Sequence, residues 1–160
     1  MNGKRIISAL ICLLVFFAFT GCGVNSNKDV VLFEVLNSIN FKFSISEEDM
    51  MRIDTLDDLE LYYNILPEDV KQFAAETTKN SSTDITEFIL IEAVDSDAAQ
   101  RVYDALMVRY NSQRDLCASY SAELLAIVNG CSVAQNGNYV TLIMSSDFDA
   151  ITEWYNSYFE

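Results

Sequence analysis

Residues 85–94 have the sequence ITEFILIEAV, in which β-branched and apolar residues run almost without interruption. Such a run predicts a β-strand. The residues that follow predict the longest helix of the chain, which is capped by Asp97 with Gln100 and ends at about Cys117. A strand followed directly by a long helix indicates a domain that mixes α and β structure.

A short helix and a hairpin are predicted after the long helix. Ser121 opens the short helix, and Asn129-Gly130 is expected to end it with a left-handed cap. Residues 131–134 and 139–144 then flank Gln135-Asn136-Gly137-Asn138. The Asn-Gly pair between two strand-like runs is the strongest hairpin signal in the chain.

Helical patterns also lie near both ends of the chain. Asp29 is placed to cap a helix, and Ser146, backed by Asp147 and Asp149, is placed to cap a final one. Each helix has an apolar stripe at helical spacing. The first stripe comprises Val31, Leu32, Val35, Leu36 and Ile39, and the second comprises Phe148, Ile151, Tyr155 and Phe159.

The middle of the chain completes the pattern. Thr55-Leu56-Asp57-Asp58 resembles a capping box that opens a short helix through Tyr62. Residues 67–78 are compatible with either a helix, because Pro67 and two acids suit a helix start, or a strand. We predict an α+β fold: a two-layer sandwich in which helices pack on one face of a small, mostly antiparallel sheet.

The N-terminal segment predicts export and lipid attachment. Lys4-Arg5 precedes an apolar run from Ile6 to Phe19, and Gly21 stands directly before Cys22. This order is typical of a lipoprotein signal peptide, in which the cysteine thiol carries the lipid. We therefore predict a signal peptide in residues 1–21, the lipidated Cys22 with a short tether in residues 22–27, and a single α+β domain in residues 28–160. The expected location is the extracytoplasmic face of the cell membrane.

The charge of the chain restricts its partners. All 24 acidic residues follow the predicted signal peptide but two of the ten basic residues lie within it, so the mature chain carries a net charge of −16. Such a surface repels phosphate backbones, which excludes nucleic acid. It also keeps an exported domain soluble. Because residues 23–27 are too short to carry the domain far from the membrane, we expect an envelope protein as the partner.

The sequence offers little for catalysis, and we expect no enzyme activity and no cofactor. The chain has no histidine, which excludes serine triads, Cys-His dyads and histidine-ligated zinc. Paired carboxylates could serve glycoside hydrolysis. Glu87 and Glu92, however, lie five residues apart on the predicted strand and therefore point to opposite faces.

Two residues are candidates for binding. Arg109 falls on the apolar side of the long helix, where it needs a carboxylate such as Glu87 or Glu123. A structural ion pair is the simpler interpretation, and docking of an anion or a partner is the alternative. Trp154 is interpreted as a core aromatic of the last helix, or else as a surface that stacks on a sugar or a partner helix.

Acidic doublets and cysteines leave two further alternatives. The doublets at Asp57-Asp58, Asp95–Asp97 and Asp147–Asp149 could bind calcium, but each lies where a helix is predicted to begin and carboxylates cap helices. Cys117 and Cys131 could form a disulfide in an exported protein. The helix predicted between them works against it, so two buried thiols are favoured.

Several motifs, in order and spacing, resemble one known family over about residues 50–159. It is domain-of-unknown-function family 4358, found mainly in lipoproteins of Gram-positive bacteria. The resemblance implies the domain boundaries and the lipid anchor but no activity. The matching motifs are Thr86-Glu87-Phe88-Ile89, Arg109 with Gln113, Tyr120-Ser121-Ala122-Glu123, Asn129-Gly130 and Gly137-Asn138-Tyr139-Val140.

Two functions follow as hypotheses. The first is a non-catalytic module that docks on another envelope protein. The second is a module that binds a small ligand or calcium, such as a cell-wall fragment held by acids or aromatics. A large pocket lined by Tyr or Trp favours the second hypothesis, and a flat apolar patch favours the first.

Overall fold

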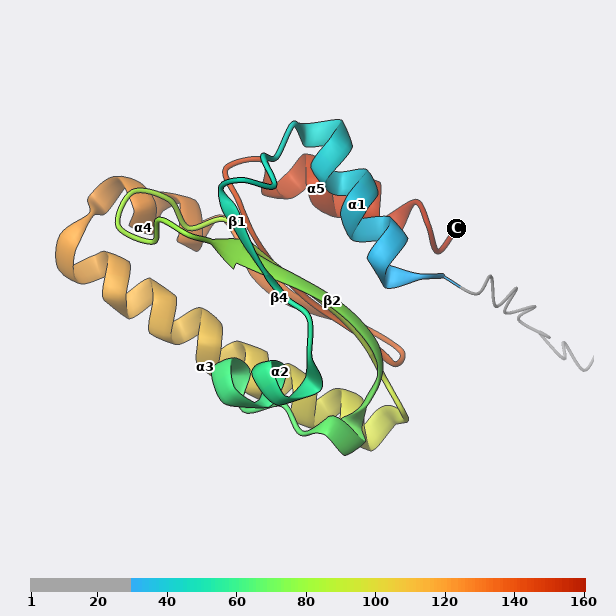
Figure 1. Cartoon of the computed structure of the whole chain (residues 1–160). Helices are drawn as coiled ribbons and strands as arrows, with labels where there is room; N and C mark the ends of the chain where they lie inside the picture. Colours follow the sequence, from blue (N-terminus) through green and yellow to red (C-terminus); the bar gives the residue numbers. More distant parts are fainter. Residues whose placement is uncertain (1–29) are drawn as a thin grey trace, which may run out of the picture.

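The computed structural model describes residues 30–160 (Figure 1). The predicted signal peptide, Cys22, the tether and the Asp29 cap lie outside the described residues. Within the described part, no helix is long and apolar enough to cross a membrane. The elements, in chain order, are α1 (Leu32–Phe43), β1 (Met50–Ile53), α2 (Leu56–Tyr63), the 3-10 turn η1 (Pro67–Asp69), β2 (Val70–Thr78), β3 (Glu87–Ala93), α3 (Ser96–Tyr120), α4 (Ala122–Asn129), β4 (Ser132–Asn136), β5 (Tyr139–Met144) and α5 (Phe148–Asn156).

The described strands form one sheet in the order β1-β2-β3-β5-β4, with every neighbouring pair antiparallel. The predicted hairpin joins β4 to β5. Its two-residue loop is Gly137-Asn138, because Asn136 pairs with Tyr139. Gly137 has a φ of +59°, so the glycine occupies the first loop position, as in a type II′ turn. The α+β class and the antiparallel sheet are confirmed.

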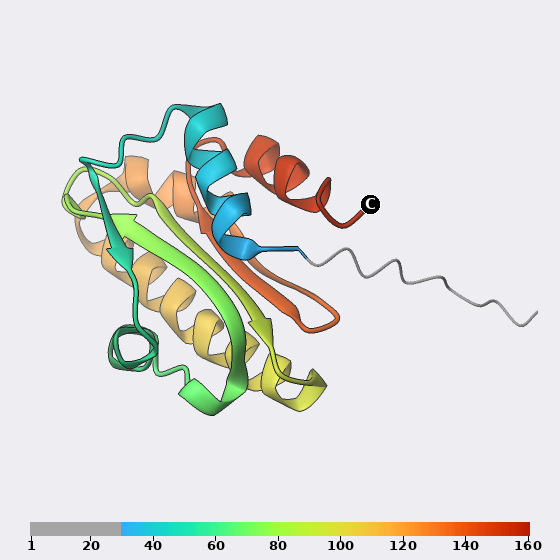
Figure 2. The same ribbon diagram turned by 45° about the vertical axis from the view of Figure 1, so that its right-hand side comes forward.

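The number of layers differs from the prediction. Ile89 and Ile91 of β3 pack in one core with α3, whereas Phe88 and Leu90 pack in a second core with α1 and α5. Helices therefore cover both faces of the sheet, and the molecule has three layers (Figure 2). The physical reason is β3 itself. A strand that is apolar on both sides needs cover on both sides.

The ambiguous segment 67–78 contains both predicted types of structure. Pro67 opens η1, where its fixed φ and missing N–H cost nothing. The chain then extends into β2, which pairs with β1 on one side and β3 on the other. A register shift between Val70 and Gln72 marks a β-bulge at the start of β2. This bulge positions the side chains of Lys71 and Gln72, whose contacts are described below.

Several helix caps were predicted correctly. The Thr55 side chain accepts a hydrogen bond from the Asp58 amide at 3.1 Å, and Ser121 accepts one from the Leu124 amide at 3.2 Å. The cap of α3 was misassigned by two residues. Asp95, not Asp97, is the N-cap, and its carboxylate accepts from the Ala98 amide at 2.8 Å.

Other helix ends differ from the prediction. Gly130 has a φ of −83°, so the expected left-handed cap is wrong. The Gly130 amide instead donates to the Ile127 carbonyl, which tightens the last turn into a 3-10 bond. Asp147 rather than Ser146 occupies the N-cap of α5, without a side-chain bond. α1 begins at Leu32, and the predicted stripe residue Val31 is 52% exposed.

Candidate docking groove

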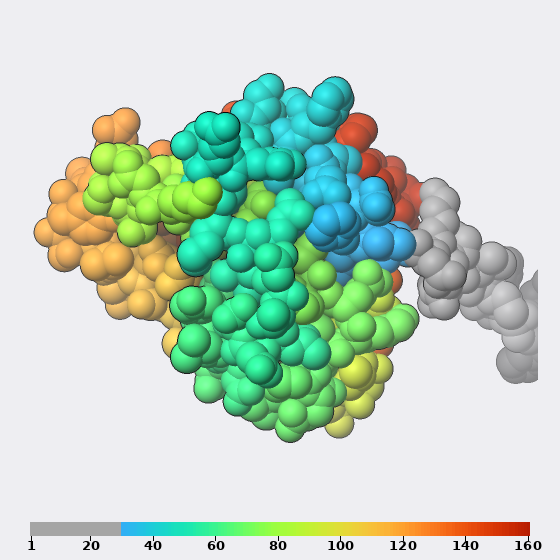
Figure 3. Space-filling view, viewed as in Figure 1, coloured from blue at the N-terminus to red at the C-terminus, as the bar shows by residue number. Residues whose placement is uncertain are grey.

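A hollow of about 380 Å³ lies between α3 and the chain that runs from the end of α2 into η1. Its apolar lining is aliphatic, and two of these side chains are open to solvent: Leu66 is 39% exposed and Val108 is 70% exposed. We call this hollow the α2–α3 groove. Figure 3 shows the outer surface of α2 on the face turned to the viewer. The groove is lined by Asn64, Ile65, Leu66, Asp69, Arg101, Val102, Asp104, Ala105 and Val108.

The groove arises from how α2 ends. Leu59 and Tyr63 are buried and hold α2 against the core. Asn64 then adopts a φ of +56°, and its amide donates to the Glu60 carbonyl at 2.8 Å, which stops the helix in a left-handed cap. The chain turns sharply, so Ile65 points into the core while Leu66 stays at the surface. The turn leaves open space beside α3.

An ion pair fixes one wall of the groove to the other. Arg101 of α3 donates from Nε to Asp69 Oδ2 at 3.0 Å and from Nη2 to Asp69 Oδ1 at 2.5 Å. The hydrogen bonds from Arg101 hold the pKa of the Asp69 carboxyl below its usual value, although burial acts in the opposite direction. Asp69 is therefore ionised and its charge is neutralised by Arg101.

The groove carries an acidic rim. Residues 53–70, which include α2 and η1, contain six acidic residues and no basic one. On α3, Asp104 lines the groove and is exposed. The segment is flanked by Arg52 and Lys71, which pair with Glu76 and Glu92. Of its exposed acids, Glu68 lies between the lining residues Leu66 and Asp69, whereas Asp54 lines the second hollow described below.

Arg109 does not line the groove and forms the predicted structural ion pair. Its Nη2 donates to Glu87 Oε1 at 2.9 Å, and its Nε lies 3.1 Å from Oε2. The Tyr63 hydroxyl donates to the same carboxylate at 2.8 Å. Burial and the nearby Glu87 charge raise the pKa of Tyr63. Glu87, rather than Glu123, is the partner, and the network joins α2, β3 and α3.

The Trp154 side chain also makes contacts within the domain. Its Nε1 donates to Ser38 Oγ at 3.1 Å, and the ammonium of Lys42 lies 3.4 Å from the ring centroid. Tyr158 packs edge-on with a centroid distance of 6.0 Å. These contacts join α5 to α1 and cover one face of the indole with a cation. Trp154 is half-buried and packs against the core that α1 and α5 form with the sheet.

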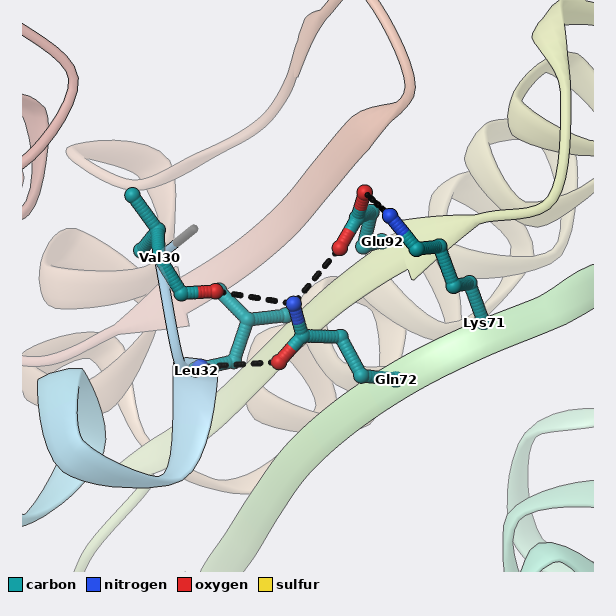
Figure 4. Close-up of polar contacts among 5 residues, drawn as sticks. All are labelled: Val30, Leu32, Lys71, Gln72 and Glu92. Atoms are coloured by element: carbon teal, nitrogen blue, oxygen red, sulfur yellow. Dashed lines mark hydrogen bonds and ion pairs between the residues drawn. The ribbon is translucent and has the colours of Figure 1, made fainter. Parts of the chain in front are cut away.

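A polar cluster that the sequence did not reveal holds the start of α1 (Figure 4). Gln72 Nε2 donates to the Val30 carbonyl at 2.8 Å, and Gln72 Oε1 accepts from the Leu32 amide at 3.1 Å. The same Nε2 lies 2.5 Å from Glu92 Oε2, and Lys71 donates to Glu92 Oε1 at 2.6 Å. The β-bulge explains how Lys71 and Gln72, neighbours in sequence, both reach Glu92.

The Glu92 carboxylate is ionised in this cluster. Burial opposes its charge, but hydrogen bonds from Gln72 and Lys71 outweigh burial and lower its pKa. Glu87 faces the other side of the sheet, as its spacing from Glu92 predicted. Glu87 is held by side chains of α2 and α3, and Glu92 by side chains of the neighbouring strand β2.

A third buried carboxylate lies under α1. Glu76 is 2% exposed, and burial raises its pKa even though Asn40 and Arg52 act in the opposite direction. Arg52 Nη2 is 3.4 Å from Glu76 Oε2 and 3.2 Å from Asn37 Oδ1. Arg52 also lines a second, smaller hollow of about 220 Å³.

The remaining candidates are placed as follows. Asp58, Asp95 and Asp147 lie at helix starts, as the capping interpretation predicted. Residues 30–160 contain no group of three or more side chains placed to ligate a metal. Cys117 and Cys131 are buried free thiols, so the alternative of a disulfide is not realised. Burial raises the pKa of the Cys131 thiol.

Comparison with known proteins gives one match. No curated protein and no solved structure matches the chain. A family model described as "Domain of unknown function (DUF4358)" matches residues 44–145, which is more than half of the chain and extends from the segment after α1 to the end of β5. The chain therefore belongs to this family of unknown function, DUF4358.

Proposed function

We propose that this protein is a lipid-anchored, extracytoplasmic module that docks on another protein of the cell envelope and performs no catalysis. The α2–α3 groove carries the proposal. It combines an aliphatic lining with two exposed apolar side chains, Leu66 and Val108. Tyrosine and tryptophan are missing from its lining, which favours contact with a protein over stacking on a sugar.

The way in which α1 begins supports the anchoring part of the proposal. Gln72 binds backbone groups of Val30 and Leu32, so the first described residue is fixed to the sheet. From Cys22 to Val30 the chain spans at most about 28 Å when fully extended. A lipid on Cys22 would therefore keep the domain, and any partner, at the membrane surface.

The contacts of Glu87 and Glu92 support a non-catalytic role. General acid–base work needs a carboxylate that faces a substrate. Glu87 is bound by Arg109 and Tyr63, and Glu92 is bound by Lys71 and Gln72. Both carboxylates are therefore used in structural contacts, Glu87 with α2 and α3 and Glu92 with β2.

Crosslinking in the native cells tests the proposal. The full-length protein is crosslinked with a membrane-permeant reagent, purified under denaturing conditions and analysed for attached proteins, with Cys22→Ser as the matched control. We expect a dominant partner that is lost or strongly reduced in Cys22→Ser. No partner, combined with a rise in melting temperature on adding calcium or cell-wall fragments, would contradict docking and support the ligand-binding hypothesis.

A further inference from the structure

The α2–α3 groove has the form of a site for a few side chains rather than for a whole domain surface. Its volume of about 380 Å³ lies at the lower end of the range of pockets that enclose small ligands. Leu66 and Val108 stand on opposite walls, one after α2 and one on α3. An apolar side chain entering between them would bury both.

The charges around the groove favour a basic partner. Asp97, Arg101, Asp104 and Val108 are spaced at three or four residues along α3, so they lie on one stripe of the helix. Arg101 is paired with Asp69, which leaves acidic groups along the stripe. On the facing chain, Glu68 is exposed and lies between the lining residues Leu66 and Asp69. Exposed acids thus lie on both sides of the apolar lining: Asp97 and Asp104 on α3, and Glu68 in η1.

We propose that the α2–α3 groove binds a basic, amphipathic segment of the partner protein: an apolar side chain inserted between Leu66 and Val108, with lysines or arginines on either side that pair with the acidic rim. This inference rests on the proposed docking function and names the chemistry of its partner. A second copy of this chain is a poor occupant, because it would bring two acidic rims together.

Site-specific photocrosslinking tests the inference in the full-length protein, expressed in its own cells. Val108→p-benzoylphenylalanine places the reactive group in the groove. Phe41→p-benzoylphenylalanine is the matched control, because Phe41 is 90% exposed but lies on α1, across the sheet from α3. After irradiation, mass spectrometry identifies the crosslinked peptide. We expect position 108 to capture a segment of an envelope protein with lysine or arginine next to apolar residues.

A charge reversal tests the role of the rim. Asp104→Lys, added to the position 108 variant, is expected to lower its crosslinking yield about fivefold, because an attraction becomes a repulsion. Glu34→Lys is the matched control: it makes the same charge change on an exposed residue of α1, across the sheet from α3, and leaves the yield unchanged.

The outcomes separate this inference from the proposed function. Capture at position 41 but not at position 108 overturns the groove as the docking site while docking itself stands. Capture at position 108 of an acidic or neutral segment, of a second copy or of a small molecule overturns the basic partner segment, as does a yield insensitive to Asp104→Lys. No captured protein at either position, and none with the chemical crosslinker, overturns docking as well.

Discussion

At the scale of single residues, the Arg109–Glu87 pair is a buried charge pair on which the stability of the core depends. Glu87 is 1% exposed, and Arg109 supplies its only cation among the described ion pairs. Arg109→Met leaves a buried carboxylate without its counter-charge, and we expect a loss of about 3–5 kcal/mol in the free energy of unfolding. Urea denaturation measures it. Arg114→Met, which removes an exposed pair with Asp115, should change stability by less than about 0.5 kcal/mol. Similar losses for both variants would contradict this assignment.

Removing the charge of Glu76 should have the opposite effect from removing Arg109, because it should stabilise the folded protein. Burial raises its pKa, so the native state binds its proton more tightly than the unfolded state does. This group's contribution to stability is therefore largest below the unfolded pKa of about 4.3 and is lost as the pH rises through the folded pKa. Glu76→Gln removes the buried charge, while Arg52 keeps its contacts with Asn37 and Phe33.

We expect Glu76→Gln to raise the free energy of unfolding by about 1 kcal/mol at pH 7, and by much less at pH 4. Denaturation of both proteins across this pH range measures the difference. A loss of stability at pH 7 would show that the ion pair with Arg52 outweighs the burial of the charge.

The sequence predicted one of these buried carboxylates and missed the other. Helical spacing placed Arg109 on an apolar face, where a charge needs a carboxylate, and Glu87 was one of two candidates. Glu76 lies in the segment 67–78, whose local sequence fits either a helix or a strand. Its burial depends on pairing with β1 and on the position of α1, which local patterns do not contain.

At the scale of elements, the β-bulge and Gln72 decide how α1 joins the sheet. Gln72→Ala removes the partners of the Val30 carbonyl and of the Leu32 amide, both in buried residues. We expect a loss of about 2 kcal/mol and faster hydrogen exchange at the Leu32 amide. Gln135→Ala, which removes an exposed contact with the Gly137 carbonyl, should change neither quantity. Unchanged exchange at Leu32 would show that packing of α1 alone holds it.

Elements whose signals are local were predicted well. The Thr55 and Ser121 caps and the β4–β5 hairpin depend on residues that are close in sequence, and the structure contains all three. The third layer was missed. The continuous apolar run in β3 predicted a strand but was not taken to require cover on both faces, and α1 and α5 come together there from opposite ends of the chain.

At the scale of the whole molecule, the α2–α3 groove shows what a sequence cannot supply. Leu66 and Val108 are separated by 42 positions, and each alone is an ordinary exposed apolar residue. Only the left-handed turn at Asn64 and the Asp69–Arg101 pair bring them to one hollow.

The proposed lipid anchor also concerns the whole molecule, because it would place the groove at the membrane surface. Two acyl chains satisfy the two-signal requirement for stable membrane attachment. We expect the wild-type protein to incorporate labelled palmitate and to sediment with membranes, and Cys22→Ser to do neither. Cys12→Ser is the matched control, because Cys12 lies in the apolar run that the predicted cleavage before Cys22 would remove. Labelling of Cys22→Ser, or loss of labelling in Cys12→Ser, would contradict attachment at Cys22. In that case the tether would not hold the domain at the membrane, the partner would not have to be membrane-bound, and the groove would bind it in solution.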